Sequence, residues 1–423
     1  MPKKIVLCLL PMLLLPVWAY ATVFVLDVDE VIHPVSAEYM IQGINQAESE
    51  QAQAVLIRLS TPGGLDQSMR EIIEKILASK VPVIVYVSPS GVRAASAGFY
   101  ILLSADLAVM APGTNTGAAH PVMIGGGKID EVMNKKVEND AAAYLRSFVS
   151  KRRRNVELAE KGVLESKSFT ETEALKDHLI DGIAQDQEDL VNQFDGKTIT
   201  RFDGSLHTLK LKGQAFYSYP MSPRQKLLTK ILDPNIAIIL GIIGLMGLYV
   251  EFTHPGFILP GVLGGLCLFL ALVALNILPI NLLGVVLIIC AVVLFVLEAK
   301  VTSYGIFAIL GVVAMVLGSL ILINAPIPEM KVRLATAIGV TLPFAGITIF
   351  LMRLVIVSHR KKSVTGEEGM VGELGLALTD ILDDGKVHVH GEIWQAHSSS
   401  PIRTGDRIKV LAVSGMKLKV EKN

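Results

Sequence analysis

Cysteine is scarce in this chain and is missing from its polar parts. The 423 residues include only Cys8, Cys267 and Cys290, and each of these lies in an apolar stretch. A disulfide framework, a zinc cluster and a cysteine nucleophile are therefore excluded from the polar segments. A nucleophile in those segments has to be an oxygen, and we expect neither a metal site nor a cofactor.

An excess of charge is also missing. Lys and Arg number 39, as do Asp and Glu, so the net charge is zero. Domains that bind nucleic acid usually carry a basic excess, so we expect no nucleic-acid partner. Charged residues make up only 18% of the chain and hydrophobic residues 51%, which indicates membrane segments.

The N-terminus has the pattern of an export signal. Lys3 and Lys4 precede an apolar run from Ile5 to Trp18, and Ala19 and Ala21 supply the small residues of a cleavage site. The run is short for a stable membrane span. The pattern therefore favours a cleaved signal peptide over residues 1–21, with an uncleaved anchor as the alternative.

Residues 22–195 alternate between short β-branched runs and helical patterns. Between the runs, residues 36–47 and 66–78 have helical spacing, with Met69, Ile72 and Ile76 on one face. Continuous Val/Ile strands separated by helices predict a parallel α/β sheet. We expect strands at Val23–Val28, Ala54–Leu59, Val81–Val87 and Leu107–Met110.

Beyond this domain, residues 196–234 are polar and predict an irregular connector or small subdomain, and residues 235–358 predict a transmembrane region. The first and third of its five apolar runs are short and are candidates for re-entrant or interfacial helices, so we expect four or five spanning helices. The basic residues at 359–362 favour a cytoplasmic end for the last span. The runs are Ile236–Val250, Phe257–Leu275, Leu282–Leu297, Ile306–Ile323 and Ala335–Val357.

The tail over residues 363–423 predicts a small all-β domain. Alternating segments at Val387–Val389, Arg407–Val413 and Lys417–Val420 are separated by turns that contain glycine. About five short strands in a segment of this length indicate a barrel of the OB type. We expect Trp394 to belong to its core.

Two segments of the first domain hold residues suited to acyl chemistry. Ser60–Gly64 (STPGG) follows the second predicted strand, and glycines there let backbone N–H groups face a cleft as an oxyanion hole requires. Ser96 lies among small residues at the start of a predicted helix, where the helix dipole favours negative charge. A simple turn and a helix-capping serine are the alternative interpretations.

A serine hydroxyl needs a base to take its proton. The residues leave three candidates open, namely Lys135, Lys136 and His120. A lysine acts as a base only when it is uncharged, which requires a desolvated site. Without such a site, the lysine pair is simply a solvated helix face.

Four motifs in register resemble those of the NfeD family of membrane-bound serine peptidases, in the ClpP/crotonase superfamily. They are STPGG, GVRAASAG, NTGAAHPV and KVENDAAAY, and the order of signal, peptidase domain, membrane block and C-terminal OB-like domain is similar as well. The resemblance covers nearly the whole chain. It implies an α/β ClpP/crotonase-like peptidase domain, an all-α transmembrane bundle and a small all-β OB-like barrel.

The resemblance also implies roles for particular residues. Ser96 matches the nucleophile and Lys136 the base, while the N–H groups of Gly64 (or Gly63) and Ala97 match the oxyanion donors. His120 remains the alternative base, because it stands at a distance after the serine similar to that in the Ser-His-Asp enzyme ClpP.

We therefore expect a serine endopeptidase that cleaves hydrophobic segments, with a stomatin/prohibitin-like membrane protein as substrate or partner. The resemblance further implies a homodimer or larger assembly. The expected location is a bacterial-type inner membrane, with the peptidase domain extracytoplasmic and the C-terminal domain cytoplasmic. One alternative is a non-catalytic scaffold that organises stomatin-like proteins. An acyl-CoA hydratase-like enzyme is a weaker alternative, because CoA thioesters are cytoplasmic and this domain is expected to be exported.

Overall fold

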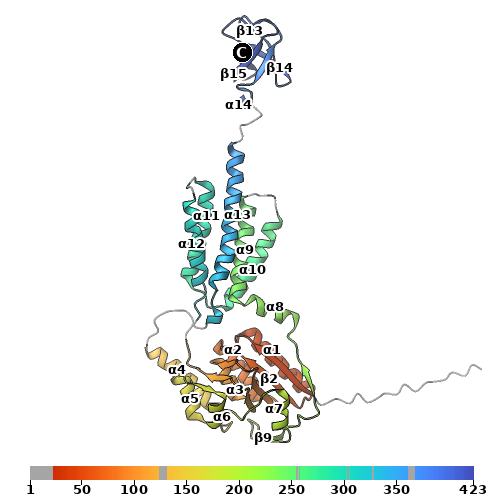
Figure 1. Ribbon diagram of the computed structural model, residues 1–423, viewed down its shortest axis with the longest axis vertical. Coiled ribbons are helices and arrows are strands. Elements are labelled where there is room, and N and C mark those ends of the chain that lie inside the picture. Colours follow the sequence, from red (N-terminus) through yellow and green to blue (C-terminus); the bar gives the residue numbers. More distant parts are fainter. Residues whose placement is uncertain are drawn as a thin grey trace, which may run out of the picture. The chain divides into compact units, whose positions relative to one another are not determined.

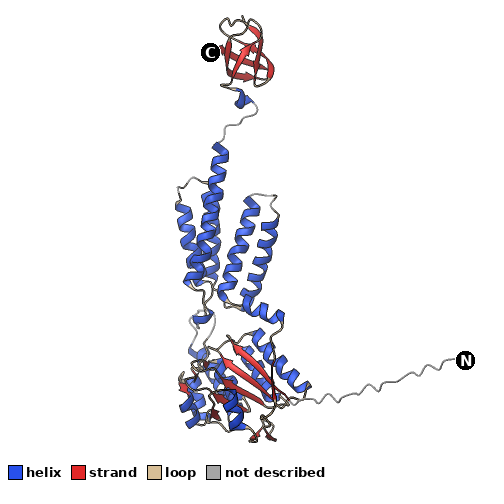
Figure 2. Ribbon diagram, turned by 45° about the vertical axis from the view of Figure 1, so that its right-hand side comes forward, coloured by secondary structure: helices blue, strands red, loops and turns tan. Residues whose placement is uncertain are grey.

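The computed structural model describes residues 22–122, 131–253, 256, 258–301, 303, 305–325, 328–360 and 367–423. The chain divides into two compact units, residues up to 294 with 309–344, and residues 295–308 with 345–423. The predicted signal peptide and Lys361–Lys362 lie outside the described residues. Figures 1 and 2 show the elements.

A six-stranded parallel sheet forms the centre of the first domain (Figure 2). The four strands expected from the sequence are all present and adjacent, as β1, β2, β3 and β5. Their order β11-β1-β2-β3-β5-β8 places their carboxyl ends along one edge. The bounds are β1 Thr22–Asp29, β2 Ala54–Ser60, β3 Val83–Val87, β5 Leu107–Met110, β8 Gly182–Ile183 and β11 Ala215–Ser218.

The sheet is buried on both faces, which explains the continuous apolar runs. Leu26, Ile57 and Val85 point to one core, packed against α1, α2 and α3, while Leu56 and Ile84 point to the other, packed against α7. The helices are α1 Pro34–Ser49, α2 Asp66–Ala78, α3 Ala97–Ser104, α4 Glu131–Val149, α5 Val156–Leu164, α6 Glu171–Lys176 and α7 Gln187–Phe194.

Two smaller sheets complete the domain. β4 (Arg93–Ala95) runs parallel to β6 (Asn115–Gly117), and β6 pairs antiparallel with β7 (Ser168–Thr170). β9 (Thr198–Thr200) and β10 (Leu206–Thr208) form an antiparallel pair. The first of these sheets positions the loop that contains Ser96.

The segment expected to be an irregular connector is more ordered than its composition indicates. β11 adds an edge strand to the main sheet beside β1, and Leu209 and Leu211 are buried in its core. The helix α8 (Pro223–Ile231) follows this strand. Because the pairing joins residues nearly two hundred positions apart, local composition does not reveal it. The α/β domain therefore extends to about residue 218.

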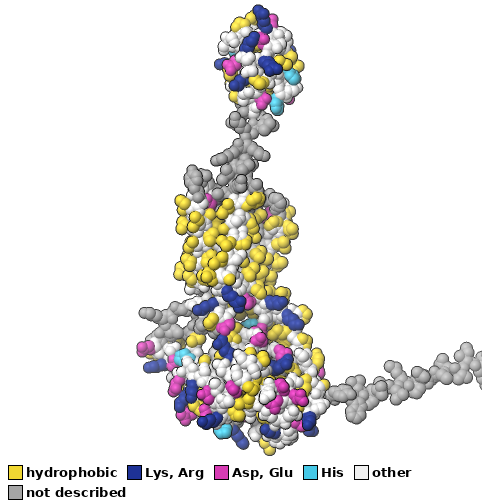
Figure 3. Space-filling view, viewed as in Figure 1, with side chains coloured by type: hydrophobic (Ala, Val, Ile, Leu, Met, Phe, Trp, Pro, Cys, Tyr) yellow, Lys and Arg dark blue, Asp and Glu magenta, His cyan; other side chains and the backbone are white. Residues whose placement is uncertain are grey.

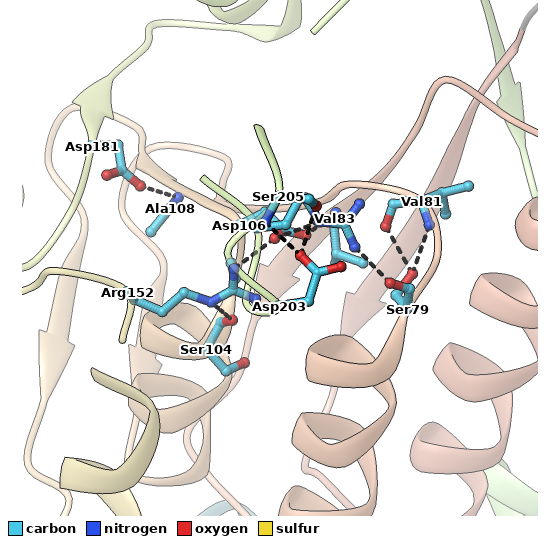
Figure 4. Close-up of polar contacts among 12 residues, drawn as sticks. Ser79, Val81, Val83, Ser104, Asp106, Ala108, Arg152, Asp181, Asp203 and Ser205 are labelled. Carbon is cyan, nitrogen blue, oxygen red and sulfur yellow. Dashed lines mark hydrogen bonds and ion pairs between the residues drawn. The ribbon is translucent and has the colours of Figure 1, made fainter. Parts of the chain in front are cut away.

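A buried polar network lies beside the amino ends of β3 and β5 (Figure 4). Asp106, with a fully buried side chain, accepts from Arg152 at 2.6 Å and from the Val83 N–H at 2.9 Å, and it lies 3.0 Å from Arg201 Nε. Asp181 accepts from the Ala108 N–H at 2.7 Å. These contacts are at the opposite end of the strands from Ser96. They give Asp106 and Asp181 structural roles.

The five apolar runs form five helices. Three are long and apolar enough to cross a membrane, over Pro234–Phe252, Leu259–Ile277 and Pro328–Phe350. The apolar helices Leu282–Glu298 and Ile306–Ile321 are shorter. The prediction that the first run is short is therefore wrong, and the shorter helices are the third and fourth. In Figure 3 hydrophobic side chains predominate on the visible surface of the helices. Their bounds are α9 Pro234–Thr253, α10 Leu259–Ile277, α11 Leu282–Lys300, α12 Ile306–Ile321 and α13 Leu334–Arg360, with a short 3-10 turn η1 at Pro328–Met330.

Glu298 is a buried carboxylate near the end of α11. It accepts a hydrogen bond from the Ser303 hydroxyl. It also accepts from the Gly305 N–H at 3.0 Å and from the Ala308 N–H at 3.2 Å. These N–H groups belong to the start of α12, where a helix leaves donors without intrahelical partners. Glu298 therefore caps α12.

The tail is a closed five-stranded barrel of order β12-β13-β14-β16-β15, as expected. Val387, Val389 and Ile408 are among its fully buried residues, and Trp394 packs against this core. The short helix α14 (Glu367–Met370) precedes it. The strands are β12 Leu374–Ala377, β13 Asp384–Val389, β14 Glu392–His397, β15 Arg407–Ser414 and β16 Lys417–Lys422.

Candidate active site

The loops that follow β1, β2 and β3 meet at the carboxyl edge of the parallel sheet. The Ile32 N–H donates to Gly63 O and the Leu65 N–H donates to Ile32 O, both at 2.8 Å. The Thr61 N–H donates to Arg93 O at 2.8 Å, which joins the second loop to the third. The carboxyl edge of a parallel sheet is where α/β folds place ligands. The topology thus brings STPGG and the Ser96 segment together.

Ser96 has an unusual backbone conformation, with φ 52° and ψ −116°. Its N–H donates to Gly117 O at 2.8 Å, and the preceding Ala95 N–H donates to Thr61 O at 3.1 Å. A non-glycine residue in this region costs about 1–3 kcal/mol, which the surrounding bonds must offset. Ser96 occupies the N-cap position of α3, but its side chain makes no capping hydrogen bond. The hydroxyl therefore does not serve the helix.

Gly63 and Gly64 differ in what they can offer an oxyanion. The Gly63 N–H donates to Thr61 Oγ1 at 3.1 Å, so this donor is already engaged. Among the described residues, the Gly64 N–H has no hydrogen-bond partner, and Ala97 is the first residue of α3, where an N–H has none within the helix. Gly64 and Ala97 both line one pocket with Ser96. The pair Gly64 and Ala97 therefore fits the donor role, and Gly63 does not.

Gly63 has a steric role instead. A Cβ on Gly63 would lie 2.7 Å from Ser96 Cβ, and its φ of 123° is unfavourable for other residues. A Cβ on Gly64 would lie 2.0 Å from Ile32 O. Both glycines are thus required by the close approach of neighbouring chain segments.

The pocket that contains Ser96 also contains Lys136. It has a volume of about 530 Å³, a size typical of ligand sites. Lys136 is exposed, and no hydrogen bond joins it to Ser96 in the part of the chain that the structure describes. The residues that the structure describes therefore do not supply the desolvation that a lysine base needs. Much of the wall is apolar, formed by Met69, Tyr100, Ala119, Pro121, Val122, Val137 and Ala141.

His120 is held away from this pocket. Its Nδ1 lies 3.1 Å from Val163 O, and its Nε2 lies 3.5 Å from Glu138 Oε1. Both ring nitrogens therefore face other partners. Neither His120 nor Lys135 lines the pocket with Ser96, whereas Lys136 does.

Sequence reasoning missed one group of residues at the pocket. Arg70 donates to Asp66 at 2.8 Å and to Asp140 at 2.6 Å, and all three line the pocket. Its guanidinium carbon lies 4.3 Å from the ring centroid of Tyr144. The spacing of Asp66 and Arg70 is that of a helical ion pair, which is too common to identify a site.

The domains together define a class of protein. A ClpP/crotonase-like α/β domain is followed by a bundle of apolar helices and by an OB-like barrel, in an integral membrane protein. Three family models match in this order: the N-terminal domain of NfeD1b at residues 22–216, the NfeD integral membrane domain at 235–354, and the NfeD-like C-terminal, partner-binding domain at 367–422. The chain belongs to the NfeD family.

Relatives cover the chain almost from end to end. Membrane-bound protease PH1510 of Pyrococcus horikoshii is 32% identical over 98% of this chain and 97% of its own length. Membrane protein NfeD1b of Bacillus subtilis is 29% identical over 94% of this chain and 92% of its own length. A solved structure of a membrane-bound stomatin-specific protease, a mutant in complex with a substrate peptide, is 32% identical, covers 50% of this chain and 98% of its own, and has a TM-score of 0.47.

Proposed function

We propose that this protein is a membrane-anchored serine endopeptidase, with Ser96 as nucleophile and Lys136 as base. The observation that carries the proposal is the convergence in one pocket of Ser96, Lys136 and the N–H groups of Gly64 and Ala97, which have no hydrogen-bond partner among the described residues. The full-length relative named as a membrane-bound protease supports it.

The proposed reaction has two stages. Lys136 Nζ takes the proton from Ser96 Oγ as the oxygen attacks the peptide carbonyl, and the Gly64 and Ala97 N–H groups stabilise the oxyanion. Lys136 then gives the proton to the leaving amine, which departs and leaves an acyl-enzyme. Water, activated by the same amine, hydrolyses the ester and restores Ser96.

Because Lys136 is exposed, the bound substrate must supply the desolvation that makes its amine a base. An amine accepts a proton only when it is uncharged, and burial favours the uncharged form. A hydrophobic peptide bound along the apolar wall would exclude water from Lys136 as it binds. This favours a hydrophobic segment as substrate, and the relative described as stomatin-specific points to a stomatin-like membrane protein.

The remaining parts of the proposal concern location and assembly. We place the α/β domain outside the cytoplasm and the barrel inside, in an inner membrane, on the export signal and the basic residues after the last helix. The barrel matches a partner-binding family model, and we assign it contact with the stomatin-like protein. We also expect a homodimer or larger assembly.

A non-catalytic scaffold is the second candidate. It is favoured by the exposure of Lys136 and by a relative named only as a membrane protein. The decisive test compares the full-length protein with Ser96→Ala and Lys136→Ala in cleavage of a quenched peptide that contains a run of Val, Leu and Ile. Both variants should lose at least about a thousandfold in kcat/KM. Cleavage by Ser96→Ala at the wild-type rate would refute Ser96 as the nucleophile. If the wild-type protein cleaves no such peptide, the scaffold is left as the function.

A further inference from the structure

The half of α4 that contains Lys136 is not anchored by core packing. The buried residues of this helix are Ala141, Ala142, Leu145, Phe148 and Val149, all in its second half. From Glu131 to Asp140 no side chain is buried. The position of Lys136 therefore depends on polar contacts made by its own half of the helix.

Two polar contacts supply that restraint. Asp140, one turn after Lys136, accepts from Arg70 of α2 at 2.6 Å, and Glu138 lies 3.5 Å from His120. The guanidinium of Arg70 also lies over the ring of Tyr144, one turn after Asp140. Arg70 thus contacts two successive turns of α4.

The other end of the Arg70 contact lies beside the proposed oxyanion loop. Arg70 donates to Asp66 at 2.8 Å, and Asp66 is the first residue of α2, two positions after Gly64. Leu65 between them is bonded to Ile32 O, which fixes the loop to the sheet edge. The Arg70 side chain therefore links α4, which contains Lys136, to the Gly64 loop beside Ser96.

We propose that Arg70 is a positioning residue, which holds the Lys136 turn of α4 at a set distance from the loop of Gly64 and Ser96. This inference rests on the proposed Ser96–Lys136 chemistry. The Arg70 and Asp140 side chains are 33% and 67% exposed, and an ion pair this exposed adds little to stability. Its effect should therefore appear in catalysis and not in folding.

The test uses the full-length protein and the quenched peptide with a run of Val, Leu and Ile. Arg70→Met should lower kcat by about tenfold while KM changes by less than about twofold, since even a 1 Å misplacement of reacting groups costs up to about a hundredfold. Arg70→Lys keeps one hydrogen bond to Asp140 and should recover part of the loss. The midpoint of thermal unfolding should be unchanged.

The matched control is Arg146→Met on the same helix. Arg146 pairs with Glu160 of α5, but it lies in the half of α4 that Leu145 and Phe148 already anchor. Its loss should leave kcat as in the wild type. Asp140→Ala should cause part of the loss seen in Arg70→Met, and the double variant should lose no more than Arg70→Met, because Asp140 acts through its contact with Arg70.

The outcomes separate this inference from the function on which it rests. If Ser96→Ala is inactive and Arg70→Met is as active as Arg146→Met, the positioning role is refuted and the peptidase stands. Additive losses in Arg70→Met and Asp140→Ala would refute it too, since independent sites add. If Ser96→Ala remains active, the proposed function itself fails.

Discussion

Replacing Gly63 by alanine should disable the site without disturbing the rest of the domain. The new Cβ would lie 2.7 Å from Ser96 Cβ, whereas ordinary contacts begin at 3.4 Å. Ser96 or the Gly63 loop must then move by about 0.7 Å, and the left-handed φ of 123° adds about 1–3 kcal/mol of strain. A misplacement of this size reduces catalysis by an estimated ten- to a hundredfold.

The assay is kcat/KM on the quenched hydrophobic peptide, together with the rate at which a fluorophosphonate labels Ser96. Gly204→Ala is the matched control, because Gly204 has a φ of 86° and a Cβ there would meet nothing within 4 Å. Gly204→Ala therefore introduces the strain of a positive φ without a steric contact. The reasoning is refuted if both variants lose the same activity per folded molecule, since strain alone would then explain the loss.

Two further predictions concern stability. Asp106→Ala should destabilise the α/β domain by about 3–5 kcal/mol in denaturant titrations, because Arg152 and Arg201 would stay buried without their carboxylate; a change below about 1 kcal/mol would contradict this. His33 caps α1, and burial lowers its pKa from 6.5 to about 4. Between these pH values the unfolded chain binds one more proton than the folded chain. The free energy of unfolding therefore falls as the pH drops from about 6.5 to about 4. His33→Asn keeps a capping side chain but does not titrate in this range. Its free energy of unfolding should fall by up to about 3 kcal/mol less than that of the wild type when the pH is lowered from 7 to 4. Equal losses in the two proteins would contradict this.

Local patterns were enough to predict the central strands, the apolar helices and the barrel. Continuous Val/Ile runs predicted β1, β2, β3 and β5 because both faces of a parallel sheet are buried. The helical period over residues 66–78 matched the bounds of α2. The membrane helices were predicted from continuous apolar runs and the barrel from alternation, because a helix in lipid is apolar all round, whereas burial of one face of a strand leaves a period of two.

Contacts between distant segments had to come from the tertiary structure. β11 pairs with β1 across most of the domain, and a polar segment of that kind resembles a connector when read alone. The sequence also could not separate Gly63 from Gly64, because the difference is the bond from the Gly63 N–H to Thr61 Oγ1.

For the candidate bases, too, the sequence determines the residue types and the fold determines which of them lies near Ser96. Lys136, Lys135 and His120 have the right chemistry by residue type, and nothing local says which of them faces Ser96. The fold turns His120 toward Val163 and Glu138, and it places Lys136 in the pocket with Ser96. Residue type and period are local properties that the chain itself determines, whereas the distance between two side chains depends on how separate elements pack, and only the folded structure decides it.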